Sequence, residues 1–217
     1  MTVVSLAFAL CLTRLSPSPL LADTGSQEGR IPTLSLAASS SPEPGASPRS
    51  AARAYMEAVL RGDAAAALAL VADPSDADRL VVKAHAASAG ALRRLEDVAT
   101  SRFGTRGDLG VAARQRRLLA ALARAPEEVA GDRAVLRPEG ERPLHLRRVE
   151  GKWKIESPAE RHTGAERREL ERALERTESV AHDLAEQIRE RAVKSAEEAR
   201  AALKKALGQD EPEGVPL

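Results

Sequence analysis

The stretch Val149–Ser157, VEGKWKIES, decides the fold of this chain because it joins a turn to an alternating strand. Gly151 supplies the turn, and Trp153 and Ile155 then alternate with charged residues, as in a strand with one buried and one exposed face. Trp153 is the only tryptophan in a chain that is 2% aromatic. We predict that its ring is the largest piece of the core and packs on the first helix near Tyr55; stacking on a ligand is the alternative role.

The residues before this strand alternate in the same way and are divided by turns. Three turn signals interrupt short segments rich in Val and Leu: Gly131-Asp132, Glu139-Gly140 and Glu150-Gly151. They predict an antiparallel meander of up to four strands. In the third segment, Leu144 and Leu146 face one side, and His145, Arg147 and Val149 face the other.

Helical periodicity precedes the meander. Ser47 or Ser50 is a candidate N-cap, and Pro48 suits the first turn of a helix. Apolar side chains then recur at spacings of three and four at Ala51, Ala54, Tyr55, Ala58 and Val59. Gly62 is expected to end this helix, and Asp63 to cap the next one.

Two further helices are predicted, from about Asp76 to Ser101 and over residues 111–125. The expected buried side of the first comprises Leu80, Ala84, Ser88, Ala91, Leu95 and Val98. The second is expected to turn inward Val111, Leu118, Leu119 and Leu122. The glycine-rich residues 103–110 between them indicate a loop, which lacks the strand and the Gly-Lys-Ser/Thr sequence of a phosphate-binding loop.

The helix–Gly–Asp–helix opening of residues 47–73, followed by a meander that closes on GKWKI, resembles the nuclear-transport-factor-2-like superfamily. The similarity is greatest to its small exported members with a SnoaL-like or ketosteroid-isomerase-like cone, and it covers residues 47–157. It implies an α+β fold in which N-terminal helices pack on a curved antiparallel meander around a pocket. The candidate pocket-lining residues are Tyr55, His85, His145 and Trp153. The catalytic residues of the family's enzymes have no counterpart that we can match here.

Residues 158–208 are predicted to form a long charged amphipathic helix. Between Gly164 and Gly208 the chain has no glycine or proline, and an unbroken helix would be about 60 Å long. An apolar stripe follows it through Leu170, Leu174, Thr177, Ala181, Leu184 and Ile188, and then drifts to Ala192, Ala196, Ala199, Leu203 and Leu207. This is an imperfect coiled-coil pattern. The stripe either packs on the chain's own domain or mediates a homo-oligomer or docking of a protein partner.

The two ends differ from the middle. Residues 1–22 have the apolar stretch and cleavage site of an export signal, and that stretch is too short to span a bilayer. Residues 23–47 and 209–217 predict a disordered linker and a disordered tail. Cys11, the only cysteine, lies in the signal. We therefore expect a periplasmic or secreted protein without disulfides, attached to a membrane only if the signal is uncleaved.

The composition gives few signs of chemistry. The chain has 33 basic and 32 acidic residues, a balance that argues against a nucleic-acid partner. No metal or cofactor is expected, since no two of the four histidines share a metal-ligand spacing: His85, His145, His162 and His182. An acid–base pair would need one of the first two histidines beside a carboxylate such as Asp97 or Asp108.

Two functions of different class follow from these observations. In the first, the chain is an exported non-catalytic binding or structural module. Its cone domain supports folding or binds a small apolar ligand, and its C-terminal helix mediates association. In the alternative, it is a ketosteroid-isomerase-like enzyme that transfers a proton on a small organic molecule in the cone pocket. Only the resemblance supports this second function, and a fold does not by itself imply a function.

Overall fold

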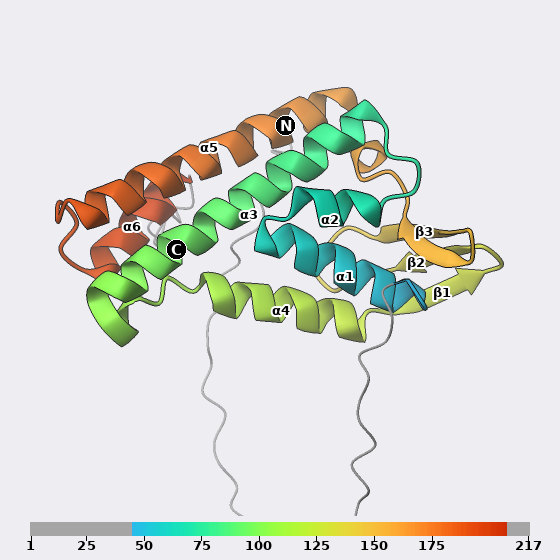
Figure 1. Cartoon of the computed structure of the whole chain (residues 1–217), viewed down its shortest axis with the longest axis horizontal. Coiled ribbons are helices and arrows are strands. Elements are labelled where there is room, and N and C mark those ends of the chain that lie inside the picture. The colour runs from blue at the N-terminus through green and yellow to red at the C-terminus, as the bar shows by residue number, and fades with distance from the viewer. Residues whose placement is uncertain (1–44, 208–217) are drawn as a thin grey trace, which may run out of the picture. The chain divides into compact units, whose positions relative to one another are not determined.

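Residues 45–207 form an α+β structure in which helices pack on a four-stranded antiparallel sheet, as the computed structural model shows (Figure 1). The structure describes these residues, so the predicted signal, the tail and the linker as far as residue 44 lie outside it. In chain order the elements are α1 (Pro48–Arg61), α2 (Ala64–Ala69), α3 (Asp76–Phe103), η1 (Gly104–Gly107), α4 (Val111–Arg124), β1 (Glu127–Ala130), β2 (Arg133–Leu136), β3 (Leu144–Val149), β4 (Lys152–Ile155), η2 (Ala159–Arg161), α5 (Gly164–Arg189) and α6 (Ala196–Ala206).

The sheet is the predicted meander, with strand order β1-β2-β3-β4 and every pair antiparallel. Glycines with positive φ stand at its three turns, Gly131, Gly140 and Gly151. The inner face is apolar and buried: Ala134, Leu136, Leu144, Leu146, Trp153 and Ile155. The predicted orientation of the third strand is therefore confirmed, because its two leucines point inward and His145 is exposed.

The free edge of β4 is covered by two segments from earlier in the chain. The Trp153 N–H donates to the Gly45 carbonyl (3.0 Å), and the Ile155 N–H donates to the Leu70 carbonyl (2.8 Å). The Ile155 carbonyl accepts from the Ala72 N–H (2.9 Å). Covering an edge in this way satisfies backbone groups that would otherwise offer a pairing site. Gly45, which the sequence placed in the linker, is therefore part of the folded structure.

Capping explains where the first two helices begin and end. The Ser47 side chain accepts from the Ser50 N–H, and the Ser50 hydroxyl is bonded in turn by the Ser47 N–H, which makes a capping box. Gly62 ends α1 in the left-handed conformation, with φ of 81°. Asp63 then caps α2 by accepting from the Ala66 N–H at 2.9 Å. All three features agree with the sequence-based prediction.

The predicted buried side of α3 is partly wrong. Leu80 is 60% exposed, whereas Val81 and Val82 are buried in two different apolar clusters. The reason is that α3 is covered on two sides, by α1 and by α5, so its buried surface is wider than a single stripe. Ser88, Ala91 and Leu95 are buried as predicted, and Ala84 and Val98 are half-buried.

The core between α1, α2, α4 and the sheet is built around Trp153. The indole is 2% exposed and belongs to the same cluster as Tyr55 of α1, which is 6% exposed. The predicted place of Trp153 in the core is therefore confirmed. Its neighbours in the cluster are small or aliphatic and include Ala51, Val59, Val71, Leu122, Leu146 and Ile155. In α4, Leu122 is buried, and the other three predicted inward residues are half-buried.

The prediction of one long C-terminal helix is wrong, because α5 ends at Arg189 and α6 begins at Ala196. Arg191 takes a left-handed conformation with φ of 65°, and Ser195 caps α6 by accepting from the Glu198 N–H. The turn allows Val193 and Leu203 to join the buried cluster between α3 and α5. Burial of this apolar surface outweighs the local helix preference of the sequence.

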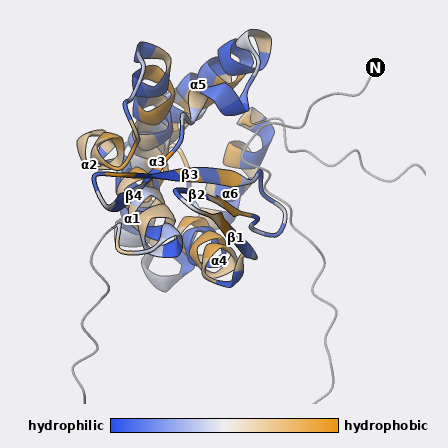
Figure 2. Ribbon diagram, turned by 90° about the vertical axis from the view of Figure 1, so that its right-hand side faces the viewer, coloured by the Kyte–Doolittle hydropathy of each residue, from blue (hydrophilic) through white to orange (hydrophobic). Residues whose placement is uncertain are grey.

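The apolar stripe on α5 is buried against α3 of the same chain. Figure 1 shows the two helices side by side, and Figure 2 shows both hydrophobic and hydrophilic positions on α5. The buried stripe residues are Leu170, Leu174, Ala181, Leu184 and Ile188, with Thr177 half-buried. The predicted stripe is thus correct as far as residue 188 and again at Ala196, Ala199 and Leu203, whereas Ala192 is exposed. Within residues 45–207, none of the helices has the length and apolarity needed to cross a bilayer.

Replacement of Trp153 by alanine is expected to lower the free energy of unfolding by about 3–5 kcal/mol, because it removes the largest side chain of this core cluster. Chemical denaturation measures this loss. His145→Ala, at an exposed position on the neighbouring strand, serves as the control and should change stability by less than about 0.5 kcal/mol. A loss below about 1 kcal/mol for Trp153→Ala would contradict its assignment to the core.

Gly107 is expected to tolerate no side chain. A Cβ atom there would lie 2.2 Å from the Ala99 carbonyl oxygen, a backbone atom that cannot rotate away. We therefore expect Gly107→Ala to destabilise the protein by about 1–3 kcal/mol in a thermal or chemical melt. Gly164, at the start of α5, has open space around its Cβ position, and Gly164→Ala should be neutral or stabilising. Equal effects of the two substitutions would refute the close approach of η1 to α3.

Candidate functional site

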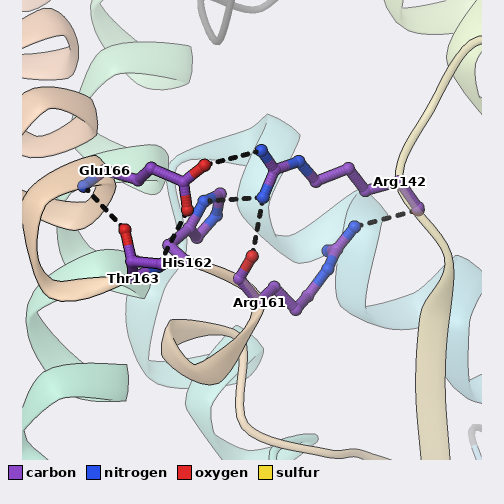
Figure 3. A network of polar contacts seen from close by, with 5 residues as sticks. All are labelled: Arg142, Arg161, His162, Thr163 and Glu166. Atoms are coloured by element: carbon purple, nitrogen blue, oxygen red, sulfur yellow. Dashed lines mark hydrogen bonds and ion pairs between the residues drawn. The ribbon is translucent and has the colours of Figure 1, made fainter. Parts of the chain in front are cut away.

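A polar cluster lies where the loop between β2 and β3 meets η2 and the start of α5 (Figure 3). We call Arg142, Arg161 and His162 the arginine–histidine cluster. The two arginines bind each other's backbone: Arg142 Nη1 donates to the Arg161 carbonyl (2.6 Å), and Arg161 Nη2 donates to the Arg142 carbonyl (2.9 Å). This reciprocal pair fixes the loop against η2.

Arg142 also links the loop to the first turn of α5. Its Nη1 lies 3.3 Å from His162 Nδ1, and its Nη2 donates to Glu166 Oε1 at 3.5 Å. The guanidinium has only donors, so His162 Nδ1 must be the acceptor and therefore unprotonated. Burial, with the charges of Arg142 and Arg161, lowers the pKa of His162 and favours this form. All the polar partners of Arg142 thus belong to the junction before α5 and to its first turn.

Glu166 is held in place by the helix that it helps to begin. Its carboxylate accepts from the Thr163 N–H (2.8 Å), and its own N–H donates to the Thr163 hydroxyl (3.3 Å), which is a capping box. The Thr163 backbone hydrogen bond, with smaller effects of the Thr163 side chain and Arg142, lowers the pKa of Glu166. The carboxylate is therefore ionised at neutral pH and engaged at the helix N-terminus.

Arg161 is the unusual member of the cluster. Its Nε is buried and has no hydrogen-bond partner within residues 45–207. Burial, together with the positive charge of Arg142, lowers the pKa of the guanidinium. A buried donor without an acceptor is rare in proteins, and on a charged group it is costly. The Arg161 Nε–H therefore lacks an acceptor in the part of the chain that the structure describes.

The charge of Arg161 also affects the pKa of two further side chains, Tyr55 and His85. Burial raises the pKa of Tyr55 to about 12 against the opposing effect of Arg161, so the phenol stays protonated. Burial, aided by His162 and Arg161, lowers the pKa of His85 to about 4 although His85 Nδ1 lies 3.1 Å from the Val81 carbonyl. His85 is therefore neutral at pH 7. The surroundings of the guanidinium thus contain a neutral phenol and a neutral imidazole.

Asp78 fixes the backbone just before Arg161 and His162. It is 1% exposed, and its carboxylate accepts four hydrogen bonds: from the Ser75 N–H (3.0 Å) and hydroxyl (2.6 Å), the Ser157 hydroxyl (2.7 Å) and the Ala159 N–H (2.9 Å). Burial alone would raise the pKa of Asp78, but the hydrogen bonds of Ser75, Ala159 and Ser157 outweigh it and lower the pKa. The carboxylate ties the start of α3 to the loop that leads into η2.

The four candidate pocket residues do not share one site. Tyr55 and His85 lie close enough to Arg161 for their charges to interact with it. Trp153 is a core residue, and the Arg148 guanidinium lies 4.7 Å from the centroid of its ring. His145 is exposed on the opposite face of the sheet from Trp153.

The acid–base pairs considered from the sequence are not formed. Asp97 lies three turns of α3 beyond His85 and is exposed. Asp108 is exposed in the loop before α4, where it accepts from the Gly110 N–H at 2.7 Å. Neither carboxylate lies beside a histidine, so the described residues do not assemble the proposed proton-transfer pair.

Sequence reasoning missed Asp78, Arg142 and Arg161. Two local signals were present, since Ser75–Asp78 and Thr163–Glu166 both have the spacing of a capping box. They mark the starts of α3 and α5, next to the cluster. No pattern in the sequence indicates that Arg142 lies beside Arg161.

Comparison of the chain with protein-family models, with curated proteins and with solved structures finds no match. Among residues 45–207, no group of three or more histidine, cysteine, aspartate or glutamate side chains is arranged to hold a metal ion. The donors that the site offers are its guanidinium groups, which bind oxyanions in preference to neutral groups.

Asp78→Asn is expected to lower stability at pH 7 by about 1.5–3 kcal/mol, because it replaces a charged acceptor of four hydrogen bonds. The folded-state pKa lies below that of the unfolded state, so the contribution of Asp78 is present above pH 4 and is lost as the pH falls below it. Urea denaturation between pH 3 and pH 7 measures both effects, and the variant should have the flatter acid limb. Asp76→Asn, at a fully exposed position two residues earlier, is the control and should follow the wild type.

Proposed function

We propose that this protein is an exported, non-catalytic binding module whose ligand is a small oxyanion held by the arginine–histidine cluster. The observation that carries this function is the buried, unpartnered Nε of Arg161. Carboxylate and phosphate oxygens are the natural acceptors for a guanidinium edge, and a charge-assisted hydrogen bond is stronger than one to water. The ligand class is defined by this acceptor chemistry.

The partial solvent exposure of the arginine–histidine cluster and its two guanidinium groups support anion binding there. The Arg142 and Glu166 side chains are 38% and 28% exposed, so the cluster borders solvent on that side, next to the buried Arg161 Nε. Arg161 shares its neighbourhood with a second guanidinium, and Glu141 and Glu166 are the nearby carboxylates that act on the two arginines. An anion bound to Arg161 Nε would supply the hydrogen-bond acceptor that neither carboxylate provides.

Other parts of the function rest on the sequence. Export is proposed from residues 1–22, and kinship with the nuclear-transport-factor-2-like superfamily, including a cone-shaped curvature of the sheet, from the helix–Gly–Asp–helix opening and the closing β4. We prefer a small oxyanion to a small apolar ligand, because Tyr55 and Trp153, two candidate residues for an apolar pocket, are buried in one apolar cluster. Catalysis is not proposed, since it rests on the resemblance alone.

We also place ligand binding before association through the C-terminal helix. The apolar stripe expected to bind a second copy or a partner is buried against α3. Association through that stripe would require α5 to leave α3, as in an exchange of helices between two copies. The C-terminal helices are therefore proposed to act first as part of the structure that positions the cluster.

The test is the dependence of thermal stability on acetate and phosphate, each exchanged against chloride at constant ionic strength and pH. A ligand that binds only the folded state raises stability by about 2.7 kcal/mol at a concentration 100 times its Kd. We expect the unfolding midpoint of the wild type to rise with at least one anion and that of Arg161→Gln to stay constant. Arg168→Gln, at an exposed position on α5, is the matched control and should respond as the wild type does.

Equal responses of the wild type and Arg161→Gln to both anions would reject the site. In the absence of anion, the variant should lose about 1 kcal/mol, because it removes the Arg161 Nη2 bond to the Arg142 carbonyl together with the unmet donor at Nε. A large loss without anion would mean that Arg161 acts through its bond to the Arg142 carbonyl instead.

A further inference from the structure

The outer face of the sheet carries positive charges that the arginine–histidine cluster does not use. The strand register places Arg133 of β2 opposite Arg147 of β3, and Arg147 opposite Lys154 of β4. These three residues, which we call the cationic row, cross three neighbouring strands. Side chains at directly opposite positions are about 5 Å apart at Cβ, and like charges there destabilise a sheet. The row is therefore unfavourable for the isolated fold.

Two carboxylates at the margins reduce this repulsion only in part. Arg133 Nε lies 3.7 Å from Glu156 Oε1, and Arg147 forms an ion pair with Asp73. The Arg133 side chain is 80% exposed and that of Arg147 is 40% exposed. Ion pairs at such exposed positions contribute little to stability and are screened by salt. The two guanidiniums thus remain accessible to a stronger anionic partner.

The two faces of the sheet differ in how they are covered. The helix α1 packs on β2, β3 and β4, and the inner side chains of these strands are buried. Along the outer face, His145 and Arg133 are exposed, and Val135, Val149 and Lys154 are half-buried. In the described part of the chain, the outer face is thus a partly apolar surface crossed by the cationic row.

We propose that the outer face of β2–β4 is a docking surface for an acidic segment of a partner protein, recognised by the row Arg133–Arg147–Lys154. Guanidinium groups bind carboxylates in two-pronged geometry, and lysine adds a point charge. The row spans about 10 Å across three strands, and alternate side chains of an extended segment are about 7 Å apart. Two neighbouring acidic side chains on one face of such a segment therefore reach the row together. Their binding relieves the repulsion that the free sheet carries.

A double charge reversal, Arg133→Glu with Lys154→Glu, tests this surface. Both substitutions place a carboxylate directly opposite Arg147, while Arg133→Glu gives up the exposed ion pair with Glu156, so we expect the denaturation midpoint to change little. Binding of a fluorescent oligoglutamate peptide should fall at least tenfold, and in the wild type it should weaken with added salt. A variant that folds as well as the wild type but loses the peptide separates docking from a structural role of the row.

Matched controls decide whether the row itself is recognised. Arg116→Glu with Arg117→Glu makes the same change of net charge at exposed positions of α4 and should retain peptide binding. Arg161→Gln should also retain it, so failure of this surface and failure of the anion site are distinguishable. An equal loss in the α4 variant would overturn the proposal, because only net charge would matter. Binding of the wild type to anionic phospholipid vesicles but not to the peptide would overturn it as well.

Discussion

The buried carboxylate of Asp78 is the constraint on which the rest of the structure depends. It accepts hydrogen bonds from two regions that are far apart in the sequence: Ser75, before α3, and Ser157 and Ala159, after β4. These hydrogen bonds hold the segment that follows β4, the last strand of the sheet, against the start of α3. The same bonds place η2, and with it Arg161, against α1 and α3. A buried charge persists because every acceptor direction is used.

Arg161, two residues after Ala159, presents the opposite case. Its guanidinium is largely buried beside a second arginine, and its Nε has no acceptor within residues 45–207. The cationic row on the outer face of the sheet is a second arrangement that works against stability. Proteins tend to keep unpartnered buried donors and neighbouring like charges where function requires them, and stabilising substitutions at those places often reduce function. The two arrangements use different residues and are the basis of the two proposed anionic ligands.

Local structure was predictable from the sequence, and the candidate site was not. Turns, helix caps and strand alternation depend on residues within about four positions, which is why Gly62, Asp63 and the β4 pattern were identified correctly. Leu80 and the turn at Arg191 were missed because burial against distant elements overrode the local pattern. The cluster needs contacts between residues 19 positions apart, and the Asp78 anchor needs a contact across 81 positions. No periodicity indicates such pairs.

The measurement that tests the central claim most directly is a side-chain ¹H–¹⁵N spectrum of the arginine Nε groups during titration with acetate and then phosphate. The signal of Arg161 is assigned by its loss in Arg161→Lys. If an oxyanion is the missing acceptor, this signal should move with saturable dependence on at least one anion, while those of exposed arginines such as Arg168 follow only the ionic strength. An Arg161 signal that stays unchanged with both anions would contradict the account and leave water as the acceptor.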